Sequence, residues 1–206
     1  MTVPPWVRHV IWWHVYPLGF VGAFPAAAPP EPGEHRLRRI ADWFDHAIQL
    51  GASGIALGPI FASRTHGYDT TDHFRIDPRL GNDDDFDYLV AEAHRRGLRV
   101  LLDGVFNHVG VDFPRYREAT HDVAAARWFR GRPGHFHTFE GHDGLLTLNH
   151  DNPEVAEYTR RSWRIGCGEA LTVGVWTLLT LCHNSSGPRS CLEFANYNRM
   201  RGSSES

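Results

Sequence analysis

The fold is decided by Leu101-Leu102-Asp103-Gly104-Val105-Phe106-Asn107-His108, an apolar strand that ends in an Asp, an Asn and a His. Burying such polar groups is costly unless they are paired or have a function. A second apolar run, residues 54–61, is followed by another polar cluster at residues 66–72. Two strands that end in polar side chains at the same end indicate the mouth of a β/α barrel.

Strand and helix patterns alternate on both sides of this stretch. The expected strands are residues 10–16, 54–57 and 99–102. Apolar residues at helical spacing predict a helix over residues 37–48, and three aspartates at 83–85 predict the start of another. This βαβαβ order favours parallel strands with right-handed crossovers. The predicted fold class is α/β, a partial (β/α)8 TIM barrel with its first three β/α units and a loop-rich insertion.

The pattern divides the chain into four segments. We expect residues 1–109 to form the N-terminal part of the barrel, 110–151 a loop-rich insertion after its third strand, 152–159 the start of the next barrel helix, and 160–206 an out-of-frame tail. In the insertion, periodicity fades into Gly, His, Pro and aromatic residues, and long loops in compact proteins are usually functional. Asn152 and Pro153 suit the N-cap and the first position of the next helix.

Composition excludes several classes of protein. The net charge of −3 gives no basic surface for nucleic acid, and the apolar runs are too short to span a bilayer. The first residues lack the charged-then-apolar layout of a secretory signal. We therefore expect no nucleic-acid or membrane partner and a cytoplasmic location.

Composition also changes near Thr159. The chain has no lysine, as expected of a very GC-rich gene, and its last aspartate is Asp151. The three cysteines, Cys167, Cys182 and Cys191, all follow the change. Either a domain boundary or a change of reading frame would produce this change in composition.

Four ordered motifs point to a known family. Residues 66–74 (HGYDTTDHF), 76–78 (IDP), 93–97 (AHRRG) and 103–108 (DGVFNH) resemble successive landmarks of the α-amylase family, glycoside hydrolase family thirteen. The resemblance covers roughly residues 10–158. It implies a (β/α)8 barrel that acts on α-linked glucosides with retention. In such enzymes one carboxylate attacks the anomeric carbon and a second carboxylic acid, about 5 Å away, protonates the leaving oxygen.

The resemblance also implies roles for single residues. Tyr68 would stack on the sugar at the cleavage point, and His108 would hydrogen-bond its hydroxyl groups. Asp72 and Asp103 would support the site, the latter by orienting its neighbours, and Asn107 would brace the loop or bind calcium where a member has that ion. No other cofactor or metal is expected. A simpler alternative is that an Asp or Asn after a strand satisfies a turn backbone.

Two further patterns limit the interpretation. Thr65 stands where some exo-acting α-glucosidases carry an aspartate, which argues against that subgroup. The spacing of four histidines in the second half of the chain matches no zinc motif, so we interpret them as loop and cleft residues: His135, His137, His142 and His150.

The chain lacks the family's catalytic carboxylates. Family members continue with a strand that ends in Gly-x-Arg-x-Asp, whose Asp is the nucleophile, and later strands bring the acid/base Glu and a second Asp. None of the three is found after Tyr158. A shifted reading frame offers an explanation. In a frame that joins the third base of each codon to the first two bases of the next, the TGG of Trp176 and the AC that begins Thr177 must give GAC, an aspartate codon.

The same shifted frame also matches the family's nucleophile motif over the neighbouring residues. Residues 169–179 can then be read as GADGWRLDAA, with plausible family helices on both sides. We therefore interpret residues 160–206 as an out-of-frame tail, the alternative being a divergent domain. Three strands of an eight-stranded barrel leave open edges, so we expect an unstable, inactive fragment of a retaining α-glycosidase. The other hypothesis is a non-catalytic truncated protein that binds sugar or a partner.

Overall fold

The computed structural model describes residues 5–25, 31 and 34–166. Of the predicted tail, residues 167–206 lie outside this part of the chain. No helix of the described residues has both the length and the apolar character needed to cross a membrane.

A parallel sheet forms the first part of the fold. Its strands stand in the order β1 (Trp12–Val15), β2 (Gly54–Leu57) and β5 (Arg99–Leu102). Trp12 lies opposite Gly54, which lies opposite Arg99. The second and third strands lie where the sequence predicts them. The first is shorter than predicted, because Pro17 opens a short helix, α1 (Pro17–Phe20), directly after Tyr16.

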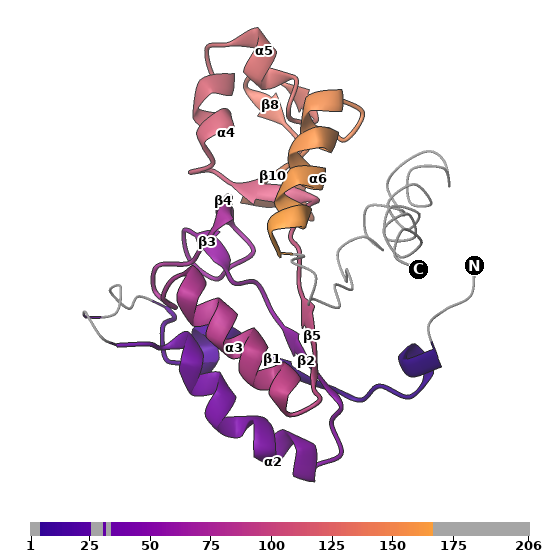
Figure 1. Cartoon of the computed structure of the whole chain (residues 1–206). Helices are drawn as coiled ribbons and strands as arrows, with labels where there is room; N and C mark the ends of the chain where they lie inside the picture. Colours follow the sequence, from indigo (N-terminus) through magenta and orange to yellow (C-terminus); the bar gives the residue numbers. More distant parts are fainter. Residues whose placement is uncertain (1–4, 26–30, 32–33, 167–206) are drawn as a thin grey trace.

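Helices connect these strands. The predicted helix over residues 37–48 is a 3-10 helix, η2 (Leu37–Trp43), continued by α2 (Phe44–Gln49). The second connection is α3 (Asp83–Arg95), which begins with a capping box between Asn82 and Asp85. Figure 1 shows α2 and α3 lying over the sheet. Phe44, Leu57 and Leu89 belong to the buried core between the helices and the sheet.

A hairpin extends from the end of β2. It consists of β3 (Phe61–Ser63) and β4 (Thr70–Ile76), which pair antiparallel. The loop between them, residues 64–69, carries much of the polar motif found in the sequence. This hairpin brings that motif beside β6 (His108–Gly110), which follows β5 in the chain.

The segment predicted as loop-rich contains short elements. They are α4 (Pro114–Ala119), α5 (Val123–Ala126), β7 (Gly131–Arg132), β8 (His135–Phe136), β9 (Thr138–Phe139) and β10 (His142–Thr147). They gather above the first sheet in Figure 1, around a second core that includes Phe113, Phe129 and Leu146. Elements of two to six residues are too short for apolar periodicity to show, which is why the sequence predicted loops.

Helix α6 (Pro153–Gly166) closes the described chain. Its first turn is capped by Asn152, whose Oδ1 accepts from Glu154 N at 2.9 Å. The buried His73 of β4 joins this helix to the rest of the fold. Its Nε2 donates to Val105 O at 2.7 Å, and its Nδ1 accepts from the Tyr158 hydroxyl at 3.1 Å. A 3-10 turn, η1 (Pro5–Arg8), precedes β1.

Candidate functional site

A cavity of about 540 Å³ lies beyond the carboxyl ends of β2 and β5, between the loop at residues 64–69 and the β9–β10 hairpin. Its lining includes Thr65, Tyr68, Asp69, His108, Phe139 and His142. The structure thus brings together the two residues that the sequence predicts to contact a sugar, Tyr68 and His108. They come from the excursions that follow β2 and β5, which is where parallel strands place functional loops.

Tyr68 stands at the edge of the cavity with 39% of its surface exposed. Burial of its hydroxyl end, together with the charge of Asp103 and a hydrogen bond to it, raises the pKa of Tyr68 to about 12. The phenol is therefore protonated at neutral pH and donates to the carboxylate. A neutral ring held at one end presents its face for stacking.

His108 forms the buried part of the cavity wall. Its ring stacks on Phe139 with the centroids 4.4 Å apart and an angle of 23° between the planes. Burial lowers the pKa of His108 to about 4, so the imidazole is neutral near pH 7. Among the described residues its Nε2 atom has no hydrogen-bond partner. Such an orphaned buried group costs about 1–3 kcal/mol until a partner arrives.

Asn107 lies beside the other ring nitrogen of His108. The Asn107 amide nitrogen is 3.5 Å from Nδ1 of His108, and an amide that donates there leaves Nε2 as the donor. An acceptor such as a hydroxyl oxygen would reach Nε2 only after a movement of the side chains that bury this atom. The backbone carbonyl oxygen of Asn107 accepts a hydrogen bond from Leu148 N at 2.9 Å, which fixes the backbone at this residue.

Asp72 lies apart from this group. Its Oδ1 accepts from Phe74 N at 2.8 Å, and it lines a separate depression with Glu157 and Tyr158 of α6. The structure therefore brings Tyr68, Asp103, Asn107 and His108 together but not Asp72. Within the described chain no three His, Cys, Asp or Glu side chains are arranged to hold a metal.

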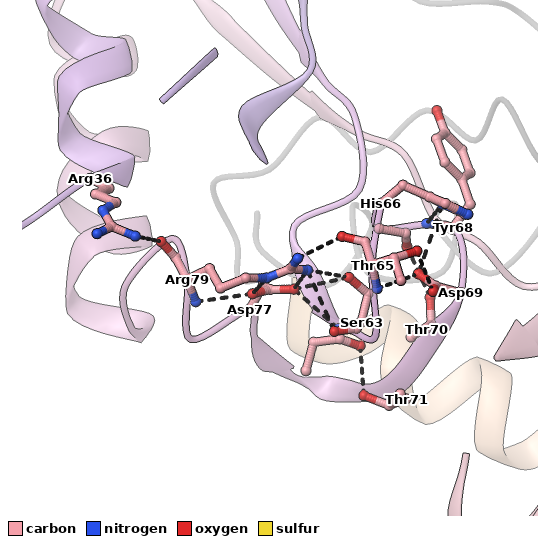
Figure 2. A network of polar contacts seen from close by, with 12 residues as sticks. Arg36, Ser63, Thr65, His66, Tyr68, Asp69, Thr70, Thr71, Asp77 and Arg79 are labelled. Atoms are coloured by element: carbon pink, nitrogen blue, oxygen red, sulfur yellow. Dashed lines mark hydrogen bonds and ion pairs between the residues drawn. The ribbon is translucent and has the colours of Figure 1, made fainter. Parts of the chain in front are cut away.

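Sequence reasoning missed several residues that shape the site. The Asp69 carboxylate accepts from Thr65 N at 3.1 Å and from Thr65 Oγ1 at 2.7 Å, and the Tyr16 hydroxyl donates to His66 O at 3.1 Å. Figure 2 shows the two bonds between Thr65 and Asp69 at the base of the loop, with the Tyr68 ring pointing away from them. The 66–72 motif contained Asp69, but nothing in the sequence singled out Tyr16 or Phe139.

Gly110 permits the close approach of β6 to the loop. A Cβ atom at this position would lie 2.5 Å from the Asp69 carbonyl oxygen, a backbone atom. Gly110→Ala is expected to lower the free energy of unfolding by about 1–3 kcal/mol, because the backbone must shift. Urea unfolding measures this, with Gly144→Ala as the matched control, since a Cβ there meets nothing within 4 Å. Equal midpoints for the two variants would contradict the expectation.

The described geometry agrees with comparisons to known proteins. A family model described as alpha amylase, catalytic domain, matches residues 22–169. The chain belongs to the α-amylase family. This confirms the resemblance carried by the four motifs. The match runs past residue 160, so the boundary of the predicted tail stays a prediction.

Relatives within the α-amylase family match much of this chain. A cyclomaltodextrinase from Geobacillus thermopakistaniensis is 34% identical over 180 residues, covering 75% of this chain and 31% of that protein. An intracellular maltogenic amylase from Bacillus subtilis is 34% identical over 182 residues, with 75% and 30% covered. The chain therefore spans a little under a third of the length of these curated relatives.

Solved structures of the α-amylase family show the same fold. The ligand-free cyclic alpha-maltosyl-(1→6)-maltose hydrolase from Arthrobacter globiformis superimposes with a TM-score of 0.72 at 28% identity, covering 84% of this chain and 45% of that one. The described strands β1, β2 and β5 are consequently part of a TIM barrel, as predicted.

Proposed function

We propose that the described residues form the sugar-binding N-terminal part of a retaining α-glycosidase barrel that acts on α-linked glucans. The observation that carries the proposal is the cavity that joins the half-exposed Tyr68 phenol to the buried, unpartnered Nε2 of His108. Tyr68 would stack on an apolar sugar face, and His108 Nε2–H would donate to a ring hydroxyl. The names of the relatives support an α-linked glucan as the ligand.

The residues up to Tyr158 do not supply the cleavage step. A retaining mechanism needs a nucleophilic carboxylate and a carboxylic acid about 5 Å apart across the scissile bond. Asp103 is engaged with the Tyr68 hydroxyl, so its role would be to orient that ring. We propose that the 206-residue chain binds sugar without hydrolysing it.

The nucleophilic carboxylate would lie in a shifted reading frame. The overlapping codon of Trp176 and Thr177 must encode aspartate, and the surrounding residues 169–179 can read GADGWRLDAA. This reading would put a nucleophile motif after α6, where the next barrel strand belongs. We also propose a cytoplasmic location, in keeping with the relative from Bacillus subtilis that is named intracellular.

Sugar binding tests the proposed function directly. Maltotriose is titrated into the full chain by isothermal calorimetry, and Tyr68→Ala and His108→Ala are each expected to raise Kd by about tenfold or more, the loss of one buried contact. Tyr88→Ala is the matched control, because Tyr88 is 41% exposed but lies on α3, away from the cavity. Unchanged affinity in both site variants would contradict the proposal.

The second candidate is a non-catalytic protein that binds a partner through the same surface. Two results together would favour this second candidate. The 206-residue chain would be expressed in soluble form, and the protein translated from the gene with its reading frame restored would not hydrolyse maltooligosaccharides.

A further inference from the structure

The loop at residues 64–69 carries Tyr68 without any regular secondary structure of its own. Backbone groups in such a loop need partners from elsewhere in the fold. One partner is Arg79, which lies between β4 and α3 and is 9% exposed. Arg79 does not line the cavity around Tyr68, so any effect on a ligand passes through the loop.

The guanidinium of Arg79 bridges a buried carboxylate and the loop. Its Nε and Nη2 donate to the two carboxylate oxygens of Asp77 at 2.9 and 2.7 Å. Its Nη1 donates to the Thr65 carbonyl at 2.6 Å, and its Nη2 also donates to Ser63 Oγ at 2.8 Å. Asp77 is completely buried, so this pair is shielded from water (Figure 2).

Thr65 passes this constraint on to the other end of the loop. Its N–H and its hydroxyl both donate to the Asp69 carboxylate, which closes the loop across its base. Tyr68 lies between these two residues, next to Gly67, whose φ of +95° sets the direction of the turn. A displaced Thr65 carbonyl would therefore move the Tyr68 ring as well.

We propose that Arg79 is a positioning residue that sets where the Tyr68 ring lies, acting through Thr65. The inference rests on the proposed function, since a fixed ring matters most if Tyr68 contacts the sugar. The planar fork of arginine offers several donors in fixed directions, whereas the ammonium group of lysine is a point charge. Lysine would keep the pair with Asp77 and lose the bond to the Thr65 carbonyl.

Tyrosine NMR of the full chain tests this role without any ligand. The six tyrosines are labelled with ¹³C, and Tyr68→Phe identifies the Tyr68 signal. In Arg79→Lys the Tyr68 signal is expected to move toward the position of an exposed tyrosine, while the Tyr158 signal stays. The Thr65 amide donates to Asp69, and its exchange is expected to accelerate by about tenfold or more, because a loop whose Thr65 carbonyl has lost Arg79 opens more often.

The matched control is Arg95→Lys, because Arg95 pairs with Glu92 on the exposed face of α3. It is expected to leave the Tyr68 signal and the Thr65 amide unchanged. Removing Arg79 alone would leave Asp77 buried and unpaired, so the second variant is the double change Asp77→Asn/Arg79→Met. It is expected to move the Tyr68 signal as Arg79→Lys does.

Two results would overturn the inference. One is an unchanged Tyr68 signal and Thr65 amide in both Arg79 variants. The other is an equal shift of all tyrosine signals, which would show that Arg79 only stabilises the fold. If Tyr68 moves in the variants while the wild-type chain does not bind maltotriose, the positioning role stands and the proposed function fails.

Discussion

A protein translated from the frame-restored gene is expected to hydrolyse maltooligosaccharides with retention, whereas the 206-residue chain is expected to show no turnover above buffer. The reason is that the restored frame would supply the nucleophile and continue into the later strands that carry the acid/base Glu, beside a cavity that already contains Tyr68 and His108. Enzymes accelerate their reactions by about a million-fold or more, so the difference is large. Reducing-sugar release measures the rate, and NMR of the first product measures its anomeric configuration.

The control for this experiment is a frame-restored gene in which the aspartate codon that overlaps Trp176 and Thr177 encodes alanine. Its product is expected to fall back to the buffer rate, because the attacking carboxylate is gone. Equal turnover by this control and by the frame-restored protein would contradict the assignment of the nucleophile.

Lowering the pH from 7 to 5 is expected to lower the free energy of unfolding by about 4 kcal/mol, about 2 kcal/mol for each of two buried histidines. Burial lowers the pKa values of His73 and His108 to about 4 in the folded protein, against about 6.5 in the unfolded chain. Between these values the unfolded state binds protons that the folded state does not. Stability is therefore lost as the pH falls below about 6.5.

Urea unfolding at pH 7 and pH 5 measures this loss. His73→Gln and His108→Gln are each expected to remove about half of the pH dependence, since one titrating group is absent in each. His150, whose pKa burial also lowers, acts in the same direction. The same free energy of unfolding at the two pH values would show that these histidines are not held neutral by burial.

The regular part of the fold could be predicted from the sequence. Buried parallel strands consist of continuous apolar runs, and both Gly54–Leu57 and Arg99–Leu102 are found where those runs predict them. The start of α3 was also evident, because acidic residues gather at a helix N-terminus. The order of these elements was enough to indicate a barrel.

The site could be predicted only in part. Tyr68 and His108 lie in motifs, and the structure brings them to one cavity. Arg79 and Phe139 had no signal, because each acts through a contact between segments far apart in the chain. The short elements of the insertion were missed for a related reason, since its core around Phe113 and Phe129 depends on tertiary packing rather than on periodicity.

Sequencing the source DNA from the codon of Tyr158 through that of Leu179 is the most direct test of the central claim, that the described residues and the missing carboxylates belong to one barrel. We predict a single open frame that runs on through the arginine and aspartate of the nucleophile strand. Confirmation of the printed frame would contradict this, and would make residues 160–206 a genuine part of a chain without the family's nucleophile.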